Sequence, residues 1–469
     1  MHRRSFLISA AAGGLAFSFE GFLRRAEMLH SESNFTKWKA AGYGDLVEVA
    51  AKNTSEKLLL LPKGFEYTVL GRAGEILKDG RQTPRSHDGM AAFRLGDELR
   101  IVRNHEVNNR KPLDHAGIGS SNHYDDQAGG GTTTLVVNPK TNELITHFVS
   151  LSGTLMNCAG GATPWGTWIS CEETTRGETP HIDTDGLEAG GFRKPHGYCF
   201  EVSASANTNL PPVPLKAMGR FAHEAVAVDR RSGIVYLTED SKPFCGFYRF
   251  LPKKPGRLAE GGKLEILVVK DKPNYDARTG QKAGATVVAT WVAIDDPDPK
   301  SADVDEQSVF KQGAAKGAAH FSKLEGCLAD VNGKVYFVSS NGGDAEGGQI
   351  WVYEPTTRAE GRLTLLFESP NRELLDMPDN ICFHPKNNLL FMCEDGNYTD
   401  AGKRPSDNYV RILTPGGKIA DFAKNIAPGF QIAEFAGATF SPDGQSLFVN
   451  IQQAGMTLAI RGDWNKFTG

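Results

Sequence analysis

The fold can be predicted from one stretch, HEAVAVDRRSGIVYLTED, which runs from His223 to Asp240. Two short apolar runs are separated by a Ser-Gly turn signal, and this pattern is typical of a β-hairpin. One acid, Glu224, stands at the head of the hairpin, and two acids, Glu239 and Asp240, stand at its tail. Because similar stretches recur along the chain, the hairpin indicates a repeated unit.

Five other segments carry the pattern. Three are close copies: EGCLADVNGKVYFVSSNGGD from Glu325, DNICFHPKNNLLFMCEDG from Asp379 and EFAGATFSPDGQSLFVNIQQ from Glu434. Two are looser: HDGMAAFRLGDELRIVRNHE from His87 and NCAGGATPWGTWISCEE from Asn157. The predicted heads are Asp88, Cys158, Glu224, Glu325, Asp379 and Glu434. Six such hairpins predict an all-β fold, a six-bladed β-propeller whose sheets surround a channel.

The repeat also sets the expected domain organisation. Residues 61–469 are predicted to form one propeller, and residues 31–60 a short helical or irregular lead-in. The longest gap between heads is expected to hold an insertion at about 252–322, which contains the charged loop DDPDPKSADVDE. A propeller is a closed scaffold, which favours a monomer.

The N-terminus predicts export. Arg3 and Arg4 precede an apolar run from Phe6 to Phe19, which is too short to span a bilayer but suits the core of a signal peptide. The arginine pair resembles a twin-arginine signal, so we expect residues 1–30 to engage the twin-arginine export machinery. The protein is then periplasmic or secreted. No clean cleavage motif follows, so both a cleaved signal and an uncleaved anchor stay open.

The composition excludes some classes of partner. The net charge is −4, and no RNA- or DNA-binding motif is present, which argues against nucleic acid as a partner. No other segment is apolar enough to suggest a membrane span. A mildly acidic protein can still bind an anionic substrate where metal ions invert the local charge.

The heads and tails of the hairpins predict a cation site. Both ends of a hairpin lie on the same side, so one mouth of the channel would be ringed by carboxylates and one thiol, Cys158. Like charges that close do not all stay ionised unless cations bind among them. Carboxylate oxygens suit Ca²⁺, and a thiolate suits a transition metal. The alternative is that the acids cap turns and recur only because the hairpins recur, with Cys158 a buried structural thiol.

At these residues the sequence resembles the PhoX-type bacterial alkaline phosphatases, from about Leu61 to Gln453. The motifs that carry the resemblance are NCAGGATPWGTWISCEE, GRFAHEAV, the LEG at Leu324, MPDNICF with CEDG, and AEFAGATFSPDGQSLFVNIQ. The resemblance implies a six-bladed propeller, twin-arginine export, a cluster of Fe(III) and Ca²⁺, and hydrolysis of phosphate esters. It implies in-line attack by a metal-bound oxygen, with no phosphorylated Ser or Cys.

The resemblance also implies roles for single residues. The iron ligands would be Cys158, Glu173, Glu224 and Glu325, and the calcium ligands Asp88, Glu106, Asp379, Asp395 and Glu434. Lys323 would contact the substrate phosphate. His223 would orient a ligand or move a proton, the alternative being an ordinary hydrogen-bonded histidine. Ala222 stands in GRFAHE where a basic residue is common in the family, which weakens the case for a monoester substrate.

Two other functions fit the same scaffold. Six-bladed calcium propellers also act as lactonases or esterases, generally with fewer acids and no thiolate. An exported binding protein, in which calcium only rigidifies the blades, is the third alternative. Cys158 discriminates between these readings, because only the phosphatase needs it as a metal ligand.

Overall fold

The computed structural model describes residues 38–107, 122–182, 188–396 and 407–468. These residues form an almost entirely β structure with one short α-helix, α2 (Ser308–Ala314). Within them, no helix is both long enough and apolar enough to cross a bilayer. The expected signal peptide, residues 1–30, lies outside the described residues.

Six antiparallel units follow one another along the chain. The first contains β4 (His87–Leu95), β5 (Glu98–His105), β6 (Gly130–Val137) and β7 (Leu144–Thr154). The second contains β8 (Asn157–Ala162), β9 (Thr167–Glu172) and β12 (Cys199–Ser203). The third contains β13 (His223–Val228), β14 (Val235–Glu239), β15 (Phe247–Pro252), β16 (Gly262–Val269) and β17 (Thr286–Ala293).

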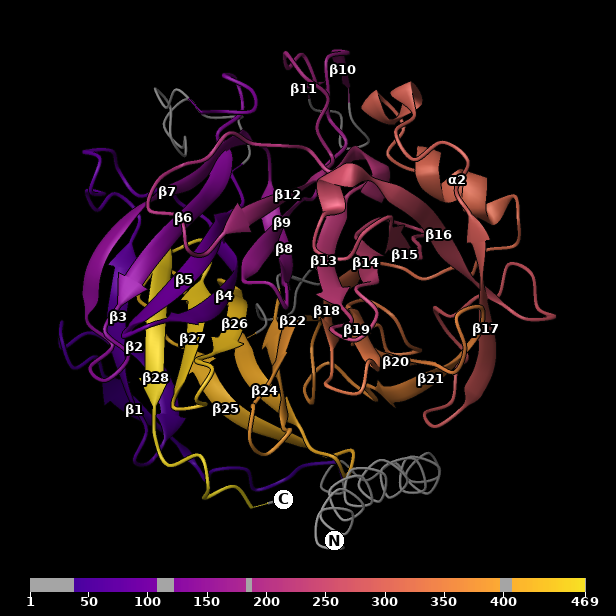
Figure 1. The fold of residues 1–469 in the computed structure, drawn as a ribbon. Helices are drawn as coiled ribbons and strands as arrows, with labels where there is room; N and C mark the ends of the chain where they lie inside the picture. The colour runs from indigo at the N-terminus through magenta and orange to yellow at the C-terminus, as the bar shows by residue number, and fades with distance from the viewer. Residues whose placement is uncertain (1–37, 108–121, 183–187, 397–406, 469) are drawn as a thin grey trace, which may run out of the picture.

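The remaining units repeat the order. The fourth contains β18 (Leu324–Ala329), β19 (Val335–Ser339), β20 (Gln349–Pro355) and β21 (Gly361–Glu368), and β21 pairs with β17 to join units three and four. The fifth contains β22 (Pro378–Phe383), β23 (Leu390–Glu394), β24 (Tyr409–Leu413) and β25 (Ile419–Asn425). The sixth contains β26 (Phe435–Phe440), β27 (Ser446–Ile451) and β28 (Met456–Arg461), and its outer strand is β3 (Glu66–Arg72). A small hairpin, β10 (His181–Ile182) with β11 (Glu188–Ala189), projects beyond the second unit (Figure 1).

The first strands of the six units form a closed ring. Each of β4, β8, β13, β18 and β22 packs against the first strand of the next unit, and β26 packs against β4. Figure 1 shows these strands toward the middle of the molecule, with the outer strands fanning away from them. The pairing of β3 with β28 joins an early strand to the last hairpin, so both ends of the described chain contribute to one unit.

The lead-in differs from the prediction of a helical or irregular segment. Residues 46–62 form β1 (Leu46–Ala50) and β2 (Lys57–Pro62), and β2 pairs with β25 of the fifth unit. The apolar run Leu58–Leu61 explains the difference, because three of its side chains are buried against the sheet, including Leu59 and Leu61 at 0% exposure. The segment 252–322, expected as an insertion, contains β16, β17 and α2.

Every first hairpin contains a β-bulge at its start. The opening pairs are His87–His105, Asn157–Glu172, His223–Glu239, Leu324–Ser339, Pro378–Glu394 and Ala436–Asn450, and the register shifts directly after each of them. A bulge leaves residues unpaired and re-aims their side chains. The residue that follows each opening position is thereby turned out of the regular ladder, toward the ring axis.

Glycines permit the close approach of the first strands. A Cβ atom on Gly161 of β8 would lie 2.0 Å from the carbonyl oxygen of Val226 in β13. A Cβ atom on Gly326 of β18 would lie 2.5 Å from the carbonyl oxygen of Asp379 in β22. Below the bulges the ring encloses a channel of about 290 Å³ lined largely by Gly, Ala and other small side chains. The ring therefore depends on small residues at these contacts.

We predict that Gly161→Ala destabilises the protein by about 1–3 kcal/mol, because the added methyl group overpacks the contact between β8 and β13. Gly416→Ala is the matched control: its Cβ atom would meet nothing closer than Thr414 Oγ1 at 3.7 Å. Denaturant unfolding of both variants measures the free energy of unfolding. Equal stability of the two variants would contradict a tightly packed ring.

Candidate metal centre

The bulge residues of five units gather at one mouth of the ring. They are Asp88, Cys158, Glu224, Glu325 and Asp379, and all five are buried. The sixth unit departs from the predicted repeat. Its bulge follows Ala436, so the structural counterpart of the five heads is Gly437, whereas Glu434 lies just before β26.

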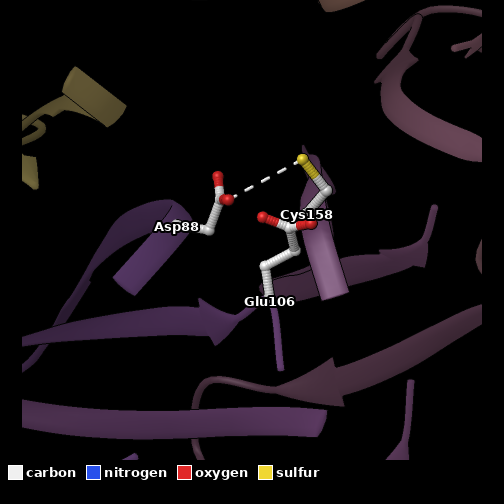
Figure 2. A group of neighbouring side chains, drawn as sticks. All are labelled: Asp88, Glu106 and Cys158. Atoms are coloured by element: carbon white, nitrogen blue, oxygen red, sulfur yellow. Dashed lines mark hydrogen bonds between the residues drawn. The ribbon is translucent and has the colours of Figure 1, made fainter. Parts of the chain in front are cut away.

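The heads and tails form three overlapping groups of ligand atoms, each within 4.8 Å of one another: Asp88, Glu106 and Cys158; Cys158, Glu173 and Glu224; and Glu224, Glu325 and Asp379. Figure 2 shows the first group, in which the three side chains point toward one another. The thiol of Cys158 donates to Oδ2 of Asp88 at 3.7 Å. Because Cys158 and Glu224 are each shared by two groups, the three groups form one continuous cluster.

The adjacent acids Glu172 and Glu173 point in opposite directions. Successive side chains of a strand alternate between faces, so only one of the two can face the channel. Glu173 joins Cys158 and Glu224 in the cluster. Glu172 is fully buried on the other side and accepts four hydrogen bonds of 2.6–3.0 Å, from the N–H groups of Leu155, Gly197 and Tyr198 and from His196 Nδ1. Glu172 therefore anchors the chain, and Glu173 is available to a cation.

Two other acid pairs repeat this division. Glu239 accepts hydrogen bonds of 2.8 Å from the N–H of Gly246 and from the hydroxyl of Tyr248. Glu394 accepts hydrogen bonds from the N–H groups of Asp376 and Tyr409 and from Nε of Arg411. Their neighbours Asp240 and Asp395 act electrostatically on the cluster, because each helps to raise the pKa of Glu325.

The carboxyl groups of the cluster repel one another. Burial, followed by neighbouring carboxylates, raises the pKa of Asp88, Glu173, Glu224 and Asp379 well above the ordinary values. Burial and Asp395 raise the pKa of Glu106 to about 7, and burial and Asp240 raise the pKa of Glu325 to about 7. Burial and Asp88 also raise the pKa of the Cys158 thiol. Cations bound among these groups would supply a counter-charge.

Glu224 gives the clearest sign of a missing partner. It is fully buried, yet neither of its carboxylate oxygens accepts a hydrogen bond from the described residues. A buried carboxylate without a partner is costly, and buried charges are normally paired or bound to a metal. Oxygen and thiolate donors together fit both hard cations and a transition metal. The residues therefore fit a multimetal site.

Lys323 lies at the edge of the cluster. Its Nζ donates to Asp240 Oδ2 at 2.8 Å and to Glu325 Oε1 at 2.7 Å. Ser340 also donates to Glu325 Oε1, at 3.0 Å. Asp240 belongs to a hairpin tail that the sequence places at the mouth, although it is not among the predicted metal ligands, and the sequence does not predict Ser340. The register could have found both, because each directly follows the last paired residue of its hairpin, as Glu106, Glu173 and Asp395 do.

The sixth unit contributes amides near the remaining acids. Gln452 Nε2 donates to Asp88 Oδ2 and to Glu106 Oε2, both at 2.7 Å. Gln453 Nε2 donates to Glu434 Oε1 at 3.2 Å. Burial and Asp395 raise the pKa of Glu434 well above its ordinary value, so these two acids are close neighbours. Gln452 thus bridges two of the expected ligands; the sequence places it in the tail of the sixth hairpin but assigns it no role.

His223 does not join the acids. Its Nε2 is 3.0 Å from the carbonyl oxygen of Gly219, and its ring lies against Phe221 with centroids 3.7 Å apart. It pairs with Glu239 and precedes Glu224, so strand alternation turns it away from the channel. His87 and His105 also face away from the acids, and each is hydrogen-bonded on both ring nitrogens, to Thr457 and Pro84 and to Arg85 and Thr133 respectively.

The fold and the site define an all-β protein with a buried carboxylate and thiol cluster suited to cations. A family model described as alkaline phosphatase PhoX matches residues 43–455, nearly the whole chain. The chain therefore belongs to the alkaline phosphatase PhoX family, which confirms the resemblance drawn from its motifs. Phosphatase activity follows as the activity of the family. No curated protein matches the sequence.

Three solved structures are distantly similar. A luciferin-regenerating enzyme has a TM-score of 0.40 at 8% identity, covering 82% of this chain and 94% of that one. A chain of a nidogen/laminin complex has a TM-score of 0.35 at 9% sequence identity, covering 72% of this chain and 92% of that one. The PQQ domain of a pyranose dehydrogenase from Coprinopsis cinerea has a TM-score of 0.33 at 9% sequence identity, covering 88% of this chain and 100% of that one. These scores are too low to support any argument about function.

We predict that the metal-free protein loses stability as the pH rises. Glu106 and Glu325 keep their protons to about pH 7 when folded, but an ordinary glutamate loses its proton near 4.5. Between these values the folded state binds more protons than the unfolded state, so the free energy of unfolding falls, by roughly 2–4 kcal/mol per group. Thermal unfolding of chelator-treated protein between about pH 5 and pH 8 measures the effect.

Reconstitution with cations is the control for that experiment. Bound cations replace the protons as counter-charges, so the loss should shrink or vanish in metal-loaded protein. A metal-free protein that gains stability over the same pH range would contradict the repulsion between the carboxylates.

Proposed function

We propose that the protein is a metal-dependent phosphoesterase that hydrolyses small phosphate esters. The observation that carries the proposal is the continuous cluster of carboxylates and one thiol, in a chain that belongs to a phosphatase family. A phosphate ester is anionic, and an acidic mouth can bind it only where cations reverse the local charge. The acids are thus read as ligands of the cations.

The scaffold of the proposal is a six-bladed β-propeller formed by residues 61–469 as one domain. The closed ring of first strands and the pairing of β3 with β28 support it. We further propose that residues 1–30 are a twin-arginine signal and that the protein acts as a monomer in the periplasm or outside the cell. Membership of the PhoX family and the arginine pair at Arg3 and Arg4 support export.

The proposed cofactors are Fe(III) and Ca²⁺. Cys158, Glu173, Glu224 and Glu325 would hold iron, because the thiolate is the soft donor of the cluster. Asp88, Glu106, Asp379, Asp395 and Glu434 would hold calcium, which prefers carboxylate oxygens. Asp240 is an added candidate, since it lies beside Lys323 and raises the pKa of Glu325. When bound, the cations would supply Lewis acidity, activating water and neutralising the phosphoryl oxygens.

The chain's own residues prepare the site for this chemistry. Lys323 is held between Asp240 and Glu325, which keeps its ammonium group charged and oriented for a substrate oxygen. Gln452 fixes the carboxylates of Asp88 and Glu106 relative to each other. His223 would act by positioning: its contact with the Gly219 carbonyl holds the start of β13, where Glu224 projects.

We predict that Cys158→Ala loses iron and at least about 100-fold in kcat/KM for a phosphate ester, because a thiolate ligand is removed. The matched control is Cys327→Ala. Both thiols are 7% exposed, but Cys327 lines the channel below the bulges. Elemental analysis and steady-state kinetics of both variants are the measurements.

Either of two outcomes would overturn the proposal. Native protein that holds calcium but no iron, unchanged in Cys158→Ala, would point to a lactonase or a binding protein instead. Equal loss of iron in Cys158→Ala and Cys327→Ala would show that the effect comes from packing and not from ligation.

We predict that Lys323→Ala raises KM by roughly 10- to 100-fold, because a charge-assisted hydrogen bond to the phosphate is lost. Lys323→Arg should recover part of the affinity. The measurement is initial-rate kinetics, with metal content determined on the same samples. Unchanged KM in a variant with native metal content would remove Lys323 from the substrate site.

A further inference from the structure

Two cysteines face each other across the second unit. Cys171 in β9 pairs directly with Cys199 in β12, and both thiols are fully buried. Their sulfur atoms are 3.7 Å apart. All seven cysteines lie in the described part of the chain, and each is a free thiol. The cluster at the channel mouth uses only Cys158, so this pair has no role in it.

The backbone geometry of the pair suits a disulfide. The N–H of Glu172 donates to the carbonyl oxygen of Tyr198, so Cys171 and Cys199 form the adjacent, non-hydrogen-bonded pair of the antiparallel ladder. Cα atoms of such pairs lie about 4.5 Å apart, inside the window of about 4.4–6.8 Å that disulfides span. Side-chain rotation alone would bring the sulfurs to bonding distance.

The register of the pair is firmly held. The Glu172 carboxylate binds the N–H groups of Gly197 and Tyr198 and the ring of His196, which are the residues that lead into β12. These bonds fix β12 against β9 at Cys171. By contrast, Cys382 and Cys393 lie on neighbouring strands but are offset, since Cys382 pairs with Phe391.

We propose that Cys171 and Cys199 form a disulfide when the protein meets a disulfide oxidant such as oxidised glutathione. A thiolate of one cysteine attacks the oxidant and releases one glutathione thiol, which leaves a mixed disulfide. The thiolate of the other cysteine then attacks the protein sulfur of that mixed disulfide and releases the second glutathione thiol. One S–S bond forms in the protein and one breaks in the oxidant. The two electrons and two protons pass to the oxidant as two thiols. Because both sulfurs are buried, exchange proceeds through local opening of β12.

The bond would close the segment between the two cysteines. This segment begins with Glu172 and the expected ligand Glu173 and returns to β12, the edge strand of the three-stranded second sheet. Closing it reduces the freedom of the unfolded chain and stabilises the folded one. The inference stands apart from phosphoesterase activity, because it rests only on the register and the sulfur positions.

The test is to incubate the folded protein in a buffer of oxidised and reduced glutathione, quench it by alkylation and map the peptides by mass spectrometry. We expect five alkylated thiols and a link between Cys171 and Cys199, with the mass of two hydrogens lost. Digestion must include cleavage at Trp165 or Trp168, because no Lys or Arg separates Cys158 from Cys171. Seven alkylated thiols, or a link between other cysteines, would overturn the proposal.

Variants separate the bond from general packing effects. Cys171→Ala should abolish the link, whereas Cys245→Ala, another fully buried thiol, should retain it. The melting temperature of the oxidised wild type should fall by roughly 2–5 °C on reduction, and that of the Cys171→Ala, Cys199→Ala double variant should not change. An equal response of the two proteins to reductant would also overturn the proposal.

Discussion

The β-bulge at the start of each first hairpin is the constraint on which the site depends. In a regular ladder, the residue after the opening pair would pair with the neighbouring strand of its own sheet. The bulge turns it toward the ring axis instead, where five units present Asp88, Cys158, Glu224, Glu325 and Asp379 to one another. The close packing of the first strands then sets the spacing, since glycines such as Gly161 and Gly326 allow backbones to touch. The acids are crowded because the ring is tight.

Crowded carboxylates destabilise the folded state. The fold limits this crowding by dividing the paired acids into two sets, of which only one faces the mouth. Glu172, Glu239 and Glu394 point into the sheets, where they accept hydrogen bonds from backbone N–H groups, a tyrosine and an arginine. Their neighbours Glu173, Asp240 and Asp395 point to the mouth. The anchoring acid fixes the end of its strand through hydrogen bonds, so the backbone holds the adjacent acid at the mouth, where Asp240 also accepts a hydrogen bond from Lys323.

The heads were predictable because the sequence repeat has a fixed distance between head and strand, and that distance survives in five units. In the sixth unit the predicted head is Glu434, the acid that opens the stretch EFAGATF. The bulge lies three residues later, at Gly437. Sequence similarity alone does not locate a β-bulge, because a bulge is defined by how two strands pair. The same limit kept Asp240 out of the predicted ligands and Ser340 out of the predicted mouth, because the place of each follows from the strand register. His223 was predicted to lie at the site because it directly precedes Glu224, but strand alternation turns the two side chains to opposite faces.

The lead-in shows a second limit of sequence reading. Within residues 46–62, β1 and β2 pair with each other, and β2 joins the sheet by pairing with β25, more than 350 positions later. Long-range pairing leaves little local signal in the sequence for a β-strand. A short segment is therefore predicted as irregular unless the sheet edge with which it pairs is known.

Repeated units do not produce a repeated site here, because the units differ in the side chains that they contribute to the mouth. The second unit supplies the thiol, the sixth supplies a glycine and the amide of Gln452, and the fourth supplies Ser340 and Lys323. Charge is therefore uneven around the mouth. The soft donor, Cys158, shares one group with Asp88 and another with Glu224, whereas the ammonium group of Lys323 is held by Asp240 and Glu325. An anionic substrate entering such a mouth would meet cations held by the acids and the ammonium group together. The orientation of the substrate would then be set by the position of one lysine within the ring.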